Sequence, residues 1–190
     1  MHFGQSLRNA IFPPWREHYI DYTKLKKLLR ETDGGDSDRE RDGEQKEEAA
    51  PWTEKDESAF VDELVNVQLE KVNRFQAQTS NMIRERMSQC EAKLDAFVSE
   101  ADGKTDELGK DLVNSEKHQR LQKVLKELDD ITVETNQLEK YSRINFTGFL
   151  KATKKHDRKR GDKYRVRPLL QVRLAALPFN SEDYSPLLYR

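Results

Sequence analysis

The 190-residue sequence contains few of the residues that mark disulfide-rich, turn-rich or membrane-spanning proteins. It has eight glycines, six prolines and a single cysteine, Cys90, and no apolar run approaches the roughly 20 residues that cross a bilayer. One cysteine excludes an intrachain disulfide framework and fits a reducing compartment. Low glycine and proline counts with few β-branched runs favour long helices. We therefore expect an all-α protein with no transmembrane segment, no signal peptide and a cytoplasmic location.

Charge is abundant but nearly balanced. Charged residues make up 36% of the chain and hydrophobic residues 35%, yet the formal net charge is only -1. This composition is typical of a surface-rich protein without a thick core, and long helices satisfy it better than a compact globule does. Any strongly basic segment in such a chain is therefore a local feature with its own explanation.

The N-terminal part predicts a small helical hairpin followed by a loop. In residues 1–31, Pro13 and Pro14 break a short helix and can start a second one at Trp15. From Asp33 to Glu48 the chain has eight acids, three bases and no large apolar residue, which is too little apolar surface to fold. We expect a flexible acidic loop over residues 33–52. It is interpreted as a solvated connector, with an electrostatic decoy for a basic helix as the alternative.

Two apolar stripes with steps of three and four residues predict two long helices that pair antiparallel. The segment at 100–109, with Gly103 and Gly109, is the expected turn between them. Cys90 lies on a stripe and is interpreted as a structural thiol. The stripes could also face another chain, so a coiled-coil scaffold stays open as an alternative. The stripe positions are Val61, Val65, Leu69, Val72, Ile83, Met87, Cys90, Leu94, Phe97, Leu121, Val124, Leu128, Ile131, Thr135 and Leu138.

Residues 145–167 carry nine Lys or Arg against two Asp. We expect a separate basic helix here, with Asn145 as N-cap and Gly161 as terminator. On a helical wheel the cations gather on one face, and Phe146, Phe149, Thr153 and His156 gather on the other. Neighbouring like charges cost about 0.2–0.5 kcal/mol per pair, so an unmixed face indicates an external anion more than a solvated surface. The cations of this face are Lys151, Lys154, Lys155 and Arg158.

A second candidate group lies in the hairpin. Tyr22 and Lys26 are four residues apart and share a helix face, with Tyr19 and Arg30 nearby. A phenol beside an ammonium suits phosphate oxygens, although the pair by itself is common. If the hairpin packs on the long helices, this pair could meet the basic face. The ligand would then be small and highly anionic.

Two motifs in this chain resemble the SPX domain family. The opening "MHFGQSLRNAIFPPWREHYIDYTKLKKLL" resembles the family's "MKFG…W…YxxYxxLKK", and "NFTGFLKATKKHDRK" resembles its "NxTGFxKIxKKHDK" signature. Both occur in the family's order, separated by an acidic loop and two heptad-patterned helices. Within the family, the tail from "VRPLL" to "LPFNSEDYSPLL" is most similar to that of fungal vacuolar transporter chaperone subunits, which belong to a polyphosphate polymerase complex.

The resemblance implies a sensor of phosphate status that binds inositol hexakisphosphate and inositol pyrophosphates. It maps one phosphate-binding cluster onto Tyr22, Lys26 and Lys155, and a neighbouring cluster onto Lys151, Lys154 and Arg158. It further implies partner proteins or an adjoining domain of a polyphosphate polymerase complex, and a place on the cytosolic face of the vacuole membrane through the full-length protein or complex. No cofactor or metal is implied.

The resemblance also implies the domain organisation. The SPX domain is expected over residues 1–167, built as an N-terminal helical hairpin packed on two long antiparallel helices plus the basic helix, an elongated helical bundle. Residues 168–190 are expected to form a final helix or linker toward a following domain.

Three positions depart from the family pattern. His2 replaces a common Lys and removes a fixed cation, Phe146 replaces a Tyr on the apolar side, and Arg158 replaces Lys with its charge retained. The first change bears on the strength or pH dependence of the site, and the other two should leave binding intact.

Two other function classes fit less well. A nucleic-acid reader would use similar basic residues, but no second element or base-reading side chain accompanies them, and the rest of the chain is acidic. An enzyme would need ligand-spaced histidines, a phosphate-cradling glycine loop or an activated nucleophile, and the sequence has no such motif. His156 lies on the apolar side of its helix and is interpreted as a packed histidine.

Overall fold

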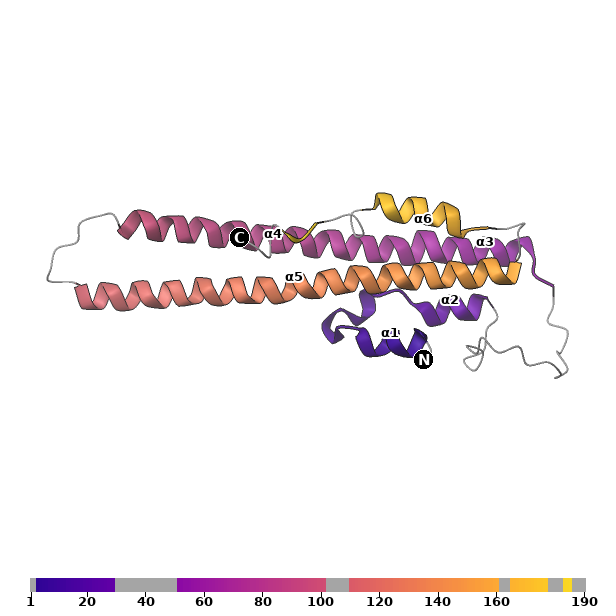
Figure 1. The fold of residues 1–190 in the computed structure, drawn as a ribbon, viewed down its shortest axis with the longest axis horizontal. Coiled ribbons are helices and arrows are strands. Elements are labelled where there is room, and N and C mark those ends of the chain that lie inside the picture. Colours follow the sequence, from indigo (N-terminus) through magenta and orange to yellow (C-terminus); the bar gives the residue numbers. More distant parts are fainter. Residues whose placement is uncertain (1–2, 30–50, 102–109, 161–164, 178–182, 186–190) are drawn as a thin grey trace. The chain divides into compact units, whose positions relative to one another are not determined.

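The computed structural model describes residues 3–29, 51–101, 110–160, 165–177 and 183–185. Every regular element in these residues is helical, which confirms the predicted all-α class (Figure 1). The chain divides into two units, one formed by residues 1–75 and 141–181 and the other by residues 76–140 and 182–190. No helix in the described ranges is both long and apolar enough to cross a membrane.

The elements follow one another in a simple order. The N-terminal part contains α1 (Phe3–Ala10), the 3-10 helix η1 (Pro13–His18) and α2 (Tyr22–Leu28). Next come α3 (Glu54–Asp62), the π-helical segment η2 (Glu63–Leu69) and α4 (Glu70–Ala101), and then α5 (Lys110–Arg160) and α6 (Arg167–Ala176). Because α4 ends at Ala101 and α5 begins at Lys110, the predicted break is confirmed. Its turn glycines, Gly103 and Gly109, lie outside the described residues.

The two long helical segments pair antiparallel in each unit. In residues 76–140, the Arg86 guanidinium bonds the carboxylates of Glu127, at 2.6 Å, and Glu134. The side chains of Ile83, Met87, Cys90, Val124, Ile131, Thr135 and Leu138 are buried, as the stripes predicted. The other stripe positions of this unit are less enclosed, because two helices cover only one side of a stripe: Leu94, Phe97 and Leu128 are half-buried, and Leu121 is 37% exposed.

The π-helical segment corrects the first stripe. Phe60 and Leu64 are fully buried, whereas Val61 and Val65 are only half-buried. A π turn closes on i+5, so the buried series steps five residues from Leu64 to Leu69. The predicted stripe used only steps of three and four, so it placed Val61 and Val65 in the core instead of Phe60 and Leu64.

The hairpin also differs from its prediction, because the two prolines do not start α2. Pro13 and Pro14 occupy the first positions of η1, which ends at His18. The next helix, α2, begins at Tyr22 itself, with Asp21 as N-cap: the Asp21 Oδ1 accepts the Lys24 N–H at 2.8 Å. Tyr19 is extended and precedes α2, so it is not on that helix.

The basic residues do not form a separate helix. They are the last turns of α5, which runs unbroken to Arg160. Asn145 is fully buried inside this helix and does not cap it, because its side chain accepts the Ile20 N–H at 2.8 Å. Gly161, the expected terminator, lies outside the described residues, as do residues 33–50 of the acidic loop.

The segment after residue 167 begins as a helix. Leu170 and Leu174 of α6 are buried in the first unit, with Val61 and Val65 lining the same depression as Leu170. The boundary at 167/168 and a following domain remain predictions.

At Gly148, the backbone of α5 comes close to the Ile20 side chain. An added Cβ would lie 2.8 Å from Cγ2 of the buried Ile20 side chain. Gly148→Ala gains about 1 kcal/mol of helix propensity, but overpacking costs about 1–3 kcal/mol, so we expect net destabilisation in urea unfolding. Gly4→Ala is the matched control: its nearest atom is 3.9 Å away, so it should gain stability. A stabilised Gly148→Ala protein would contradict this contact.

Cys90 provides a second test. Its side chain is 1% exposed, burial raises the pKa of its thiol, and Glu127 adds to the rise. Thiolate is the reactive form, so alkylation by iodoacetamide at pH 8 should be at least about tenfold slower than for a free cysteine. The rate should recover in urea, and fast alkylation of the folded protein would refute the buried position.

Candidate functional site

The hairpin is fixed along the end of α5 at three points. The Ile20 N–H donates to Asn145 Oδ1 at 2.8 Å, and Ile20 contacts Gly148. Farther along, the Lys159 ammonium donates to the Leu29 carbonyl at 2.9 Å. Contacts of Ile20 near residue 145 and of Leu29 near residue 159 mean that α2 runs in the same direction as α5 (Figure 1). The helix carrying Tyr22 and Lys26 therefore borders the basic turns.

The π-helical segment holds the start of α2 from another side. The Asp21 N–H donates to Gln68 Oε1 at 2.8 Å, and Gln68 Nε2 donates to Glu63 Oε1 at 2.7 Å. Glu63 also pairs with Lys24 at 2.7 Å. Because this segment turns Glu63 and Gln68 inward, two buried polar side chains fix the first turn of α2.

Phe3 of α1 brings Tyr22 and Lys151 together. The Tyr22 side chain is buried, and its ring meets the Phe3 ring edge-on at a centroid distance of 5.0 Å. The Lys151 ammonium lies 5.9 Å from the centre of the same Phe3 ring. Residues 151 and 22 belong to segments far apart in sequence, so this grouping is a product of the tertiary fold.

Two contacts join α2 to α5, Ile20 with Asn145 and Leu29 with Lys159. Lys26 lies between these contacts on α2, and Lys155 lies between them on α5. Lys26 is half-buried and Lys155 is only 8% exposed. Lysine is rarely so buried, because removing an ammonium from water costs free energy. The structure thus places Tyr22, Lys26, Lys151 and Lys155 on neighbouring turns of α2 and α5.

Lys154 and Arg158 are exposed. Lys154 lines a separate depression with residues at the start of α6, so it does not share the Phe3 contact of Lys151. The wheel predicted one cationic face, and the structure divides that face between α1 on one side and α6 on the other. Of the residues that depart from the family pattern, Phe146 is half-buried and His2 lies outside the described residues.

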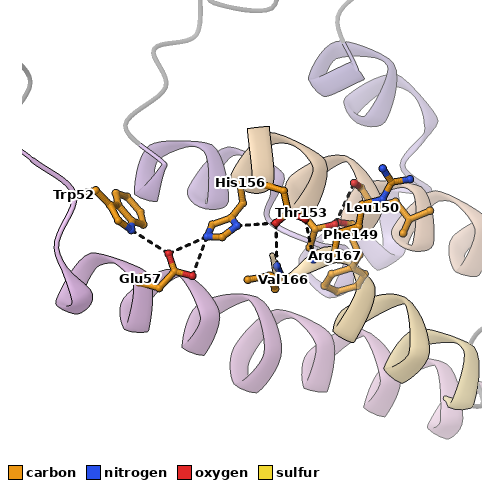
Figure 2. Close-up of polar contacts among 9 residues, drawn as sticks. Trp52, Glu57, Phe149, Leu150, Thr153, His156, Val166 and Arg167 are labelled. Carbon is orange, nitrogen blue, oxygen red and sulfur yellow. Dashed lines mark hydrogen bonds and ion pairs between the residues drawn. The ribbon is translucent and has the colours of Figure 1, made fainter. Parts of the chain in front are cut away.

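A buried polar chain behind the basic turns was not predicted. His156 is fully buried, as expected for a packed histidine, and its ring stacks on Phe60 at 4.8 Å. Its Nε2 lies 2.9 Å from Glu57 Oε1 (Figure 2). Its Nδ1 lies 3.0 Å from Asp157 Oδ1. The Trp52 indole N–H donates to Glu57 Oε2 at 3.0 Å. Glu57 is 99 residues from His156 in sequence, so no local pattern could reveal the pair.

Asp157 connects this chain to α6. Its Oδ1 accepts the Val166 N–H at 3.0 Å, and its Oδ2 accepts the Arg167 N–H at 3.1 Å. Val166, at the N-cap position, makes no side-chain cap of its own. A carboxylate at a helix N-terminus satisfies free N–H groups and interacts favourably with the helix dipole. The last turns of α5 therefore hold the start of α6.

Lys71 is a further charged residue near the hairpin that the sequence did not single out. It lines a cavity of about 200 Å³ together with Tyr19, Asp21 and Tyr22. Burial lowers the pKa of its ammonium, and the negative charges of Asp21, Glu17 and Glu63 oppose that shift. Lys71 therefore adds one half-buried cation beside α2, among three carboxylates.

The Asp157 cap predicts a local stability effect. Asp157→Ala removes both acceptors of the first α6 turn, and losing an N-terminal cap costs about 0.5–2 kcal/mol. We expect faster amide hydrogen exchange throughout residues 167–176. Asp129→Ala, at an exposed position on α5, should leave that exchange unchanged. Unchanged exchange in the Asp157 variant would rule out the capping role.

Comparison with known proteins identifies relatives along the whole chain. Residues 1–49 match the family model described as the SPX domain. Vacuolar transporter chaperone complex subunit 2 of Saccharomyces cerevisiae is 39% identical over 190 residues, covering all of this chain and 20% of that protein. Subunit 2 of Schizosaccharomyces pombe is 37% identical, over 99% of this chain and 22% of that protein. The chain thus spans about a fifth of the length of these relatives.

Two further similarities concern proteins named for the same domain. SPX domain-containing protein 1 of Arabidopsis thaliana is 30% identical, covering 96% of this chain and 65% of that protein. The solved SPX domain of Chaetomium thermophilum glycerophosphodiester phosphodiesterase 1, in complex with inositol hexakisphosphate, shares the fold. Its TM-score is 0.50 at 21% identity, over 96% of this chain and 89% of that one. The comparisons confirm the resemblance read from the two sequence motifs: residues 1–49 match the SPX domain model, and the chain is similar along its length to vacuolar transporter chaperone subunits.

Proposed function

We propose that this chain is a sensor domain that binds inositol polyphosphates and pyrophosphates. The observation that carries the proposal is the packing of α2 along the last turns of α5, which gathers Tyr22, Lys26, Lys151 and Lys155 from two distant segments. The fold neighbour from Chaetomium thermophilum was solved with inositol hexakisphosphate, which supports the same ligand class here. No catalytic role is assigned to these residues.

The chemistry of the face suits a compact polyanion. Phosphate oxygens accept hydrogen bonds from ammonium groups and from a phenol, and each charge-assisted bond contributes about 1.5–3 kcal/mol when well formed. About six such bonds would give micromolar affinity after ordering costs and salt screening. Arg158 and Lys154, both exposed, supply outer cations.

Binding at this face provides a means of regulation. A polyanion touching α2 and α5 together favours the arrangement in which the hairpin lies along α5, so ligand shifts the population toward it. The relatives are subunits of a vacuolar transporter chaperone complex. We propose that the domain senses phosphate status and regulates polyphosphate synthesis accordingly. The domain would act at the cytosolic face of the vacuole membrane, on an attached domain or a partner protein.

Calorimetric titration with inositol hexakisphosphate at near-physiological salt tests this proposal. Lys26→Ala and Lys155→Ala should each weaken binding at least about tenfold, and Tyr22→Phe about fivefold, because each removes a phosphate donor. Lys140→Ala, an exposed lysine on the same α5 helix, should change affinity less than twofold. Circular dichroism of each variant checks that it is folded.

The outcomes are distinct. Binding that is absent, or equal in all variants, would reject the polyphosphate face. Displacement of the ligand by a short DNA duplex would favour the nucleic-acid alternative. A stable dimer by light scattering, without ligand binding, would favour the coiled-coil scaffold.

A further inference from the structure

A second basic depression lies where the end of α5 meets the start of α6. It has a volume of about 390 Å³, and Arg165 and Arg167 contribute to it together with Lys154. The remaining lining residues are Asp157, Pro168 and Gln171. The two arginines belong to the basic stretch at 145–167, yet neither the wheel nor the family resemblance assigns them a role.

The one acid among the described lining residues, Asp157, directs its oxygens to other groups than the Lys154 and Arg167 side chains. Both Asp157 oxygens already accept backbone N–H groups, from Val166 at 3.0 Å and Arg167 at 3.1 Å. Its Oδ1 also lies 3.0 Å from the ring of the buried His156. Within the part of the chain that the structure describes, the side chains of Lys154 and Arg167 form no ion pair. Lys154 and Arg167 therefore contribute two positive charges to the depression, against the single carboxylate of Asp157.

One donor of a lining residue is buried without an acceptor. Arg167 Nε is shielded from solvent and has no hydrogen-bond partner. A buried donor left unsatisfied costs about 1–3 kcal/mol, so native structures seldom keep one without a reason. A guanidinium presents its donors as a planar fork that matches the oxygens of a phosphoryl group.

We propose that this depression binds a phosphoryl oxyanion of a small oligophosphate. Lys154 supplies charge, Arg167 supplies the directional donors of its guanidinium, and the Gln171 side chain can add an amide donor. The volume falls in the range of small-ligand sites, about 300–1,000 Å³, and exceeds what a single ion requires. The site shares Lys154 with the outer cations of the inositol phosphate face, but α1 and α2 contribute nothing to its lining.

Occupancy of this site would act on α6. The ligand would contact α5 through Lys154 and α6 through Arg167 and Gln171, so it binds the docked arrangement of α6 and stabilises it by mass action. The start of α6 would then be held to α5 twice, by the Asp157 cap and by the bound anion.

The test is a calorimetric titration with inorganic diphosphate at near-physiological salt. We expect Arg167→Gln and Lys154→Gln each to weaken diphosphate binding at least tenfold. Arg173→Gln is the matched control: Arg173 is exposed on the same helix and lines a different depression, so binding should change less than twofold. Hydrogen exchange at Leu170 and Leu174 checks that α6 remains docked in each variant.

Two further arms separate this site from the proposed inositol phosphate face. Lys26→Ala should lose inositol hexakisphosphate but keep diphosphate, and Arg167→Gln should show the reverse. Diphosphate should also bind protein saturated with inositol hexakisphosphate, with affinity lowered less than tenfold because only Lys154 is shared. If inositol hexakisphosphate displaces diphosphate, and does so only when Arg167 is present, the depression binds a phosphate of the inositol ligand. That result would overturn the proposal of a separate oligophosphate ligand.

Two results would overturn the site itself. The first is no diphosphate binding at millimolar concentration. The second is binding that Lys26→Ala abolishes while both Arg167→Gln and Lys154→Gln leave it intact, which would place the anion on the other face.

Discussion

The hydrogen bond from the Ile20 N–H to the buried Asn145 side chain sets the register on which the candidate face depends. Asn145 is fully enclosed, and its own amide donates to the Tyr141 carbonyl at 2.8 Å, so the side chain has little freedom to turn. A buried amide without partners is costly, which makes a shifted hairpin unfavourable. Because Gly148 admits Ile20 one turn later, α2 can lie close to α5.

The last turns of α5 serve several partners at once. One side holds α2 through Asn145 and Lys159, another meets α3 through His156 and Glu57, and Asp157 holds α6. A rigid helix can carry all of these contacts because successive side chains point in different directions about 100° apart. Any ligand that engages the exposed cations of this segment therefore acts on a helix already fixed to three neighbours.

Polar contacts, rather than apolar area alone, specify how these helices are arranged. The apolar stripe would tolerate small shifts of one helix along another, whereas the Glu57–His156–Asp157 chain and the Asn145 bond each have one satisfied geometry. Phe60 stacked on His156 shows the two kinds of contact combined at one position. The basic turns keep their orientation because their buried side is this strongly determined.

The sequence by itself determined the helical class, the antiparallel pairing, the break at 100–109 and the buried side of residues 149–156, because each follows from local spacing. The resemblance to the SPX domain follows from contiguous motifs. It misplaced the start of α2 and made the basic turns a separate helix, since Asn145 suits an N-cap locally and only Ile20, 125 residues away, gives it another role. The tertiary structure alone decided that Lys154 faces α6 while Lys151 faces Phe3. Which neighbour covers each side of a helix is a long-range choice, and local periodicity contains no information about it.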